Sequence, residues 1–136
     1  MAKKTYTYKG LQGEIRGWKT PPIDSFENVY SDKEFEIVMS IPEFTCICPK
    51  TGLPDFATLT LVYVPNKVCL ELKSLKEYLL AYRNKGIFHE NVVNKVAEDI
   101  VRAIKPRRLK LEGKFNARGG IQTTVVREFS SRKKKS

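Results

Sequence analysis

Hydrophobic periodicity changes twice along this chain of 136 residues, and the change restricts the folds that it can adopt. Apolar and polar residues alternate over residues 35–41, which predicts a half-buried strand. Residues 56–64 are apolar or threonine at nearly every position, which predicts a strand covered on both faces. Over residues 72–105 the apolar spacing becomes three and four, as in helices, and alternation returns over residues 109–115 and 121–128.

The helical stretch divides into two helices because turn-forming residues interrupt it. The first covers residues 72–82, and the second covers residues 88–105, where Pro106 ends it. Pro42 is expected to end the first strand, since proline cannot donate to a strand ladder, and a loop then fills residues 43–54. The order strand, strand, helix, helix, strand, strand predicts an α+β domain with a four-stranded antiparallel sheet and both helices on one face.

The two ends of the chain lack this patterning. Residues 1–33 hold glycines and prolines with little periodicity, and we expect an irregular N-terminal arm that a neighbouring subunit could order. Residues 34–129 form the single domain that a chain of this length accommodates. Residues 130–136 are basic and are expected to form a disordered tail.

Composition argues against a membrane protein or a secreted protein. No apolar run reaches the roughly 18 residues of a membrane span, and the first residues lack the apolar stretch of a signal peptide. We therefore expect a cytoplasmic protein, in which the three cysteines, Cys46, Cys48 and Cys69, remain thiols. The net charge of +10 invites a nucleic-acid partner, but much of it lies near the termini, where basic residues are often simply solvated.

The loop after the first strand contains the residues most suited to catalysis. Cys48 lies in a loop rich in proline and glycine, where a thiol can be held as the thiolate that attacks carbon. Asp55, at the start of the next strand, could curl back and serve as acid or base. The plainer alternative is a buried cysteine and a turn aspartate. The three cysteines and His89 could also hold zinc, although a one-residue gap between two of them is unusual for such a site.

Three other segments contain candidate binding residues. Two lysines and a serine within residues 71–76, near a helix N-terminus, could hold a phosphate or could form a solvated face. Glu90, beside His89, could accept hydrogen bonds from a guanine-like base or could simply suit the helix dipole. The Arg-Gly-Gly run at residues 118–120 could bind a phosphate or form a tight turn. The chain has neither G-x-G-x-x-G nor a Walker motif, so a dinucleotide would not be held by a Rossmann unit.

Five segments carry more information together than any of them alone. They are CPKTGLPDFAT at residues 48–58, ELKSLK at 71–76, YRN at 82–84, GIFHE at 86–90 and RGGI at 118–121. In this order they resemble the NADPH-dependent 7-cyano-7-deazaguanine reductases of queuosine biosynthesis, in the short single-domain form. The resemblance runs over residues 43–126, and ELKSLK is the signature of that family.

The resemblance implies a tunnelling fold, shared with GTP cyclohydrolase I, in which subunits join their sheets into a barrel. It also implies a homo-oligomer, a decamer of two stacked pentamers, with active sites at the subunit interfaces. Cys48 would add to the nitrile carbon of 7-cyano-7-deazaguanine as a covalent thioimide, and Asp55 would protonate the nitrile nitrogen. NADPH would reduce this adduct to the aminomethyl product, with no metal and no direct need for nucleic acid, and Cys46 would have no catalytic role.

The resemblance further implies which residues bind the two small molecules, the deazapurine substrate and NADPH. The deazapurine would be held by Leu70, Glu71, Leu72, His89 and Glu90. NADPH would be contacted by Lys73, Ser74, Lys76, Arg118 and Gly119.

Three other functions fit parts of the sequence. A related amidinotransferase of archaeosine formation acts on nitrile-modified tRNA and shares the cysteine and the aspartate, but it does not need the NADPH signature at residues 71–76. A non-enzymatic basic RNA-binding module would tolerate Cys48→Ala and would bind RNA with a steep dependence on salt. A metal-dependent cyclohydrolase of the same fold would bind zinc.

Overall fold

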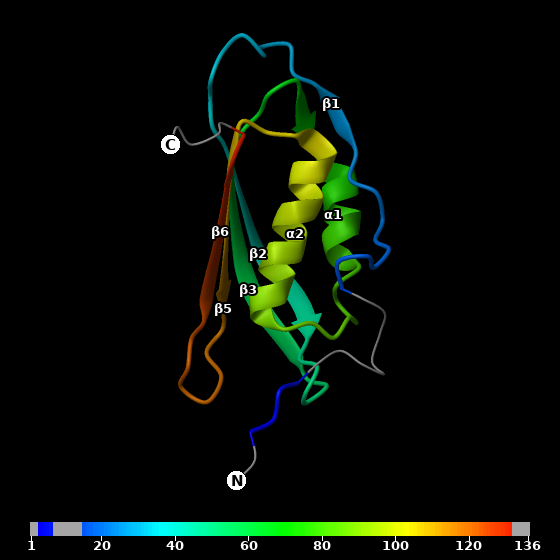
Figure 1. The fold of residues 1–136 in the computed structure, drawn as a ribbon, viewed down its shortest axis with the longest axis vertical. Coiled ribbons are helices and arrows are strands. Elements are labelled where there is room, and N and C mark those ends of the chain that lie inside the picture. Colours follow the sequence, from blue (N-terminus) through cyan, green and yellow to red (C-terminus); the bar gives the residue numbers. More distant parts are fainter. Residues whose placement is uncertain (1–2, 7–14, 132–136) are drawn as a thin grey trace.

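The computed structural model describes residues 3–6 and 15–131, and its helices and sheet form two layers (Figure 1). The elements in chain order are β1 (Ser25–Glu27), β2 (Ile37–Ile47), β3 (Pro54–Val64), β4 (Val68–Leu70), α1 (Leu72–Leu80), α2 (His89–Ile104), β5 (Arg108–Phe115) and β6 (Thr124–Ser130). The order of the long elements confirms the prediction. The two short strands, β1 and β4, were not predicted.

The four long strands form one antiparallel sheet in the order β2-β3-β5-β6, and both helices lie on one face of it (Figure 1). This arrangement confirms the predicted α+β class, sheet and helix layer. Apolar side chains from the sheet and from both helices form a single core between the layers. Gly113 of β5 allows α2 to approach the sheet closely, because a Cβ atom there would lie 2.6 Å from the Val93 side chain.

Strand β2 does not end at Pro42, as the sequence predicts, but continues to Ile47. A bulge at this proline sets two residues of β2 opposite one residue of β3. The proline is tolerated because β2 is an edge strand. The bulge also changes which residues face the core, so that Phe44 and Cys46 are buried. The loop that follows is therefore shorter than predicted and covers residues 48–53.

Strand β3 is covered on one face only, so the prediction of cover on both faces is wrong for this single chain. Its core-facing residues, among them Leu59 and Leu61, are buried. On the other face Phe56 is 47% exposed, and Thr58 and Thr60 are half-buried. An apolar and threonine-rich strand satisfies the same pattern whether its second face is covered by its own chain or by another. The outer face of the sheet is open in the single chain.

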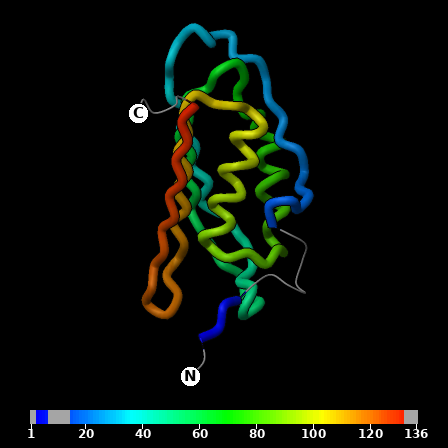
Figure 2. The backbone as a smooth tube through the Cα atoms, in the orientation of Figure 1, coloured from blue at the N-terminus to red at the C-terminus, as the bar shows by residue number. Residues whose placement is uncertain are grey.

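Ile15, Trp18 and Ile23 of the N-terminal arm pack against the core of their own chain (Figure 2). Ordering of the arm by a neighbouring subunit stays a prediction. The Trp18 ring meets the Tyr82 ring edge-on, with centroids 5.2 Å apart. Arg16 forms an ion pair of 2.6 Å with Glu98 of α2. Strand β1 pairs with β4 in antiparallel fashion. Strands of three residues are too short to show alternation, which is why the sequence pattern missed them.

Several element boundaries differ from the predicted ones. Helix α1 ends at Leu80, two residues early, and β6 begins at Thr124, three residues late, because a tight hairpin precedes it. Helix α2 ends as predicted, with Lys105 in the left-handed region at φ 44° and Pro106 after it. In the part of the chain that the structure describes, neither helix is long and apolar enough to cross a membrane. Residues 132–136, most of the predicted tail, lie outside the described residues.

Candidate active site

Cys48 lies directly after β2, where the chain turns into β3. Two backbone hydrogen bonds close this turn: the Cys48 N–H donates to the Leu53 carbonyl at 2.8 Å, and the Gly52 N–H donates to the Cys48 carbonyl at 2.9 Å. Gly52 has a φ of 74°, in the left-handed region that favours glycine. The turn therefore holds the thiol, half-buried, at one end of the sheet.

The hydrogen bonds around Cys48 favour its thiolate. Burial raises the pKa of the Cys48 thiol, but hydrogen bonds from the Thr51 side chain and from the backbones of Thr51 and Lys50 outweigh that effect. The negative charge of Asp55 also raises this pKa, but the net pKa of Cys48 still lies below its usual value. A partly exposed thiol of lowered pKa is the form of cysteine that acts as a nucleophile.

Asp55 is buried at the start of β3, on the other side of the same turn. Its Oδ2 atom lies 3.1 Å from Nε2 of His89, and its Oδ1 atom lies 3.3 Å from Nη2 of Arg118. The Arg118 guanidinium also donates to the Pro54 carbonyl. Asp55 lies opposite Cys46 in the β2–β3 register, so the two side chains expected to do the chemistry flank the same turn.

His89 is the first residue of α2, and its ring is fixed from two sides. The imidazole stacks on the Phe115 ring, with centroids 3.8 Å apart and planes 8° from parallel. Its Nε2 atom makes the contact with Asp55 described above. The sequence analysis assigned His89 to the substrate and missed both partners, because Phe115 gives no signal beyond an apolar position in a strand. Glu90, the next residue, is exposed at the start of the same helix.

The connector between the helices brings the start of α2 close to the Cys48 turn. Ile47, the last residue of β2, donates its N–H to the Lys85 carbonyl at 2.9 Å. The Ile47 carbonyl in turn accepts the Ile87 N–H at 3.0 Å. Residues 85–87 thus run beside the end of β2. Cys48 directly follows Ile47, and His89 lies two residues after Ile87. Both residues therefore extend from backbone segments that are hydrogen-bonded to each other.

Cys46, in β2 two residues before Cys48, has a different environment. Its sulfur is buried in the core, 3.9 Å from the Ile87 carbonyl. Burial raises the pKa of the Cys46 thiol to about 12, with smaller contributions from the charges of Asp55 and Cys48. A thiol in this state is inert at neutral pH.

The predicted binding residues at the start of α1 are engaged largely with their own chain. The Glu71 carboxylate caps the helix, accepting the N–H groups of Lys73 at 2.6 Å and Ser74 at 2.9 Å. These two hydrogen bonds hold the pKa of Glu71 below its usual range. The buried Ser74 hydroxyl donates to the Glu71 carbonyl at 2.9 Å and accepts the Asp24 N–H at 2.8 Å.

Two of these residues already have partners within the single chain. The Ser74 hydroxyl is buried and holds the N-terminal segment. The Leu70 N–H donates to the Tyr63 hydroxyl at 3.0 Å. Their contacts with NADPH and with the deazapurine stay predictions. Leu72 is 63% exposed, and Lys73 and Lys76 are exposed on the same helix.

The Arg-Gly-Gly run forms a tight hairpin. Arg118 and Ile121 exchange two backbone hydrogen bonds, of 2.9 and 3.0 Å. Between them Gly119 and Gly120 have φ values of 59° and 81°, which a two-residue hairpin of this hand requires. The glycines thus serve the turn, and the Arg118 side chain forms an ion pair with Asp55. The NADPH contact expected of this run stays a prediction.

The predicted site residues fall into two groups. The thiol cluster contains Cys48, Asp55, His89, Glu90, Arg118 and Gly119. The α1 cluster contains Leu70, Glu71, Leu72, Lys73, Ser74 and Lys76. The C-terminal end of α1 leads into the connector beside the thiol cluster, so the start of α1 lies about one helix length, ~13 Å, farther away (Figure 1). One chain does not bring the two clusters together.

The alternative zinc site is not assembled. Cys69 lies in β4, next to β1, away from the turn that holds Cys48 (Figure 1). Over residues 3–6 and 15–131, no group of three or more histidine, cysteine, aspartate or glutamate side chains is placed to hold a metal ion.

Proteins of known name are similar in sequence to this chain over most of its length. Residues 54–134 match the family model described as QueF-like protein. The chain is 53% identical over 111 residues to the NADPH-dependent 7-cyano-7-deazaguanine reductase of Chloroherpeton thalassium, covering 82% of this chain and 96% of that protein. It is 57% identical over 106 residues to the protein of the same name from Nitrosomonas eutropha, covering 78% of this chain and 76% of that protein.

A solved structure, described as the crystal structure of the archaeosine synthase QueF-Like in the apo form, has a similar fold. Its TM-score is 0.66, and the match covers 72% of this chain and 96% of that chain. At 21% identity this likeness concerns the fold alone. The family model and the sequence relatives go further than the fold: the chain belongs to the QueF-like protein family.

Proposed function

We propose that this chain is an NADPH-dependent 7-cyano-7-deazaguanine reductase, which reduces a nitrile to a primary amine in queuosine biosynthesis. One observation carries the proposal: a single turn holds the half-buried Cys48 thiol on one side and, on the other, a buried Asp55 that contacts His89 and Arg118. The relatives that are 53% and 57% identical carry this name. The free cysteines suit the reducing cytoplasm, where we expect the enzyme to work.

Cys48 is the nucleophile of the proposed reaction. Its thiolate forms a C–S bond to the nitrile carbon while the nitrile nitrogen takes up a proton, which gives a covalent thioimide. The thioimide accepts hydride more readily than the nitrile does. After the first reduction the C–S bond breaks, Cys48 leaves as a thiolate, and the imine stays bound for the second reduction.

Asp55 and His89 supply the protons. Because the two side chains are 3.1 Å apart, a proton can lie between them, and we assign the proton given to the nitrile nitrogen to this pair. Arg118 fixes the other carboxylate oxygen, so Asp55 has one direction in which to deliver a proton. Stacking on Phe115 keeps the His89 ring from turning away.

The lysines of the α1 cluster fit the phosphates of NADPH. Lys73 and Lys76 are exposed near the start of the helix, whereas the backbone donors there are taken by Glu71. Phosphate contacts would therefore come from ammonium groups rather than from the helix N-terminus. When bound, NADPH supplies one hydride for each of the two steps, so each nitrile consumes two NADPH and two protons.

We further propose that a complete site forms between two copies of the chain, with the thiol cluster from one and the α1 cluster from the other. Three features support this: the distance between the clusters, the open outer face of the sheet, and the edge strands β2 and β6. A barrel of joined sheets would pair these edges and cover that face. The deazapurine would then lie between Glu90 and His89 of one copy and Glu71 of the next, in the expected decamer of two pentamers.

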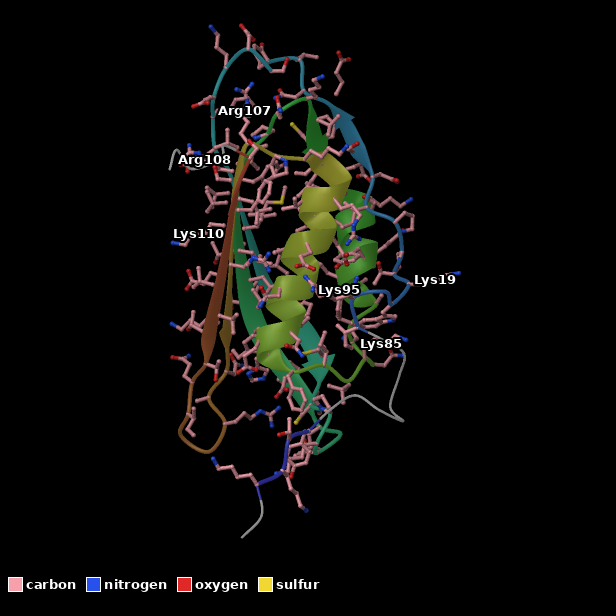
Figure 3. The ribbon with its side chains drawn as sticks, viewed as in Figure 1. Lys19, Lys85, Lys95, Arg107, Arg108 and Lys110 are labelled. Atoms are coloured by element: carbon pink, nitrogen blue, oxygen red, sulfur yellow. The ribbon has the colours of Figure 1, made fainter. Side chains whose placement is uncertain are left out.

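The alternative functions have less support. The archaeosine synthase shares the fold at 21% identity, whereas the reductases share more than half of the aligned residues. An RNA-binding module would gather its basic residues on one surface. Instead, Arg107 and Arg108 lie at one end of the sheet, Lys110 lies on β5, and Lys19 and Lys85 lie on the side of the helices (Figure 3).

Oxidation of NADPH tests the proposed function. The purified chain should oxidise two equivalents of NADPH for each equivalent of the free base 7-cyano-7-deazaguanine, and Cys48→Ala should abolish this activity. Transfer of ammonia to nitrile-modified tRNA, without NADPH oxidation on the free base, would instead identify the amidinotransferase.

A further inference from the structure

The first turn of α2 carries His89 and Glu90, and it starts without a side-chain cap. Phe88 occupies the N-cap position, and its apolar side chain accepts no hydrogen bond from the backbone that follows. An uncapped first turn tends to fray, because its leading N–H groups lack partners within the helix. The Glu90 side chain is exposed, so its position depends on what holds the backbone of this turn.

The half-buried Asn94 side chain, one helical turn later, connects this backbone to the sheet. Its Nδ2 atom donates to the Glu90 carbonyl at 2.7 Å, and its Oδ1 atom accepts from Nη1 of Arg127 at 2.6 Å. The two partners fix the direction of the amide, because a carbonyl can only accept a hydrogen bond and a guanidinium can only donate one. An ionised aspartate of the same shape would keep only the bond to Arg127.

Arg127 is itself held, so it provides Asn94 with an anchor. It comes from β6, and its Nη1 atom also lies 3.6 Å from Oε2 of Glu98. The same Glu98 oxygen pairs with Arg16 of the N-terminal segment at 2.6 Å. The connection therefore runs from an edge strand of the sheet, through a single amide, to the backbone of Glu90.

We propose that Asn94 is a positioning residue, which uses Arg127 as its anchor and holds the first turn of α2 so that Glu90 meets the deazapurine. The inference rests on the proposed function in that it takes Glu90 to bind the base. Asn94 acts through the Glu90 backbone and does not touch the reacting atoms. A binding group that is held before the substrate arrives need not be ordered on binding, which favours affinity. Loss of the connection should therefore change KM rather than kcat.

Steady-state NADPH oxidation by Asn94→Ala tests this role. We expect the KM for 7-cyano-7-deazaguanine to rise by about threefold to tenfold, the usual effect of one lost hydrogen bond, while kcat stays within about twofold of the wild type. The urea midpoint of unfolding should change little, because alanine is a better helix former than asparagine and this gain offsets the lost bond. A merely structural role predicts the reverse, a lower urea midpoint with an unchanged KM.

A double-mutant cycle with Arg127→Met tests whether the two side chains act as one connection. Either change alone breaks it, so the KM of the double variant should equal that of a single variant rather than show the product of the two increases. Arg102→Met is the matched control. It removes an exposed arginine that pairs with Asp99, about two turns farther along α2, and should leave KM unchanged.

Amide hydrogen exchange, measured without substrate or cofactor, tests the connection independently of the reaction. Exchange in the peptide that begins α2 should be about threefold to tenfold faster in Asn94→Ala than in the wild type, because the first turn opens more often. Arg102→Met should leave exchange in this peptide unchanged.

A wild-type KM in Asn94→Ala, independent effects of the two changes in the cycle, or unchanged exchange at the start of α2 overturns the proposal. If Asn94→Ala does not fold, as judged by circular dichroism, Asn94→Asp decides in the same way, since it keeps the bond to Arg127 and loses the bond to Glu90. Failure of the proposed function gives a different result: the wild type would oxidise no NADPH with the free base, even though exchange at the start of α2 still depended on Asn94.

Discussion

The thiol cluster and the α1 cluster use their polar groups in opposite ways. In the thiol cluster, β3, α2 and the last hairpin bring Asp55, His89 and Arg118 into contact at the turn that carries Cys48. In the α1 cluster, Glu71 and Ser74 satisfy the backbone of their own helix and of the N-terminal segment. The polar side chains of the first group contact one another within one chain, whereas the exposed charges of the second, Lys73 and Lys76, face outward.

In the proposed two-copy site, this difference would divide the work between the two ends of the domain. The reacting groups need fixed distances and so are built on one folded unit. The groups that hold a base or a phosphate can be presented to a neighbour, because charge acts over a longer range than a hydrogen bond. The following changes should affect the two clusters differently.

The largest effect should follow from Cys48→Ala. Loss of the nucleophile should lower kcat/KM for nitrile reduction by on the order of 10⁴-fold, because no other group in the thiol cluster can form the C–S bond. Steady-state NADPH oxidation measures this loss. Cys46→Ala is the matched control, and it should retain activity, since that thiol is buried and its pKa is raised to about 12.

Replacement of the acid should have the next largest effect. Asp55→Asn should lower kcat by about 10²- to 10⁴-fold, the usual range for loss of a general acid, while the protein remains folded. It should also make Cys48 easier to ionise, because the charge of Asp55 raises the pKa of that thiol. Cys48 of the variant should therefore react faster with iodoacetamide at neutral pH, although the variant reduces the nitrile more slowly. If it reacted more slowly in both assays, the assignment of Asp55 as an acid near the sulfur would be wrong.

Co-expression of two inactive variants would test whether one site draws on two copies. Cys48→Ala damages the thiol cluster, and Glu71→Ala damages the α1 cluster. If each site combines the clusters of two neighbours, the mixed oligomer should regain about a quarter of the wild-type activity, since that fraction of sites receives two intact halves. Cys48→Ala mixed with Asp55→Asn should regain nothing, because both changes lie in the same cluster.

The smallest effect should be the dependence of stability on pH at the start of α1. Because the pKa of Glu71 is lowered by folding, its cap contributes stability above the unfolded pKa, and this contribution is lost as the pH falls through the folded value. Glu71→Gln should therefore have a lower urea midpoint of unfolding than the wild type at pH 7. The difference between the two midpoints should be smaller at pH 3. Glu77→Gln, an exposed change in the same helix, should have the same urea midpoint as the wild type at both pH values.

The sequence predicted the sheet, the helix layer and the loop that holds Cys48 because each depends on local pattern. Periodicity depends on which faces of an element are buried, and Cys48 lies in a segment whose composition alone marks a turn. The pattern failed where tertiary context decided the outcome. At Pro42 the edge position of β2 allowed a bulge instead of a strand end.

The partners of Asp55 could not be predicted from the sequence for the same reason. His89 and Arg118 lie far from Asp55 along the chain, and only the packing of α2 and of the last hairpin brings them to it. At the start of α1 the sequence did not reveal a structural role. Ser74 lies in a segment typical of a phosphate site, and in the fold its hydroxyl also holds Asp24.

Intact mass spectrometry tests the central claim, that the Cys48 thiolate attacks a nitrile, most directly. The protein is mixed with 7-cyano-7-deazaguanine without NADPH, so that any covalent adduct accumulates. We predict a gain in mass equal to that of the nitrile, mapped to Cys48, absent from Cys48→Ala and weaker in Asp55→Asn. An unchanged mass in the wild type, or an adduct that maps to another residue, would contradict the account.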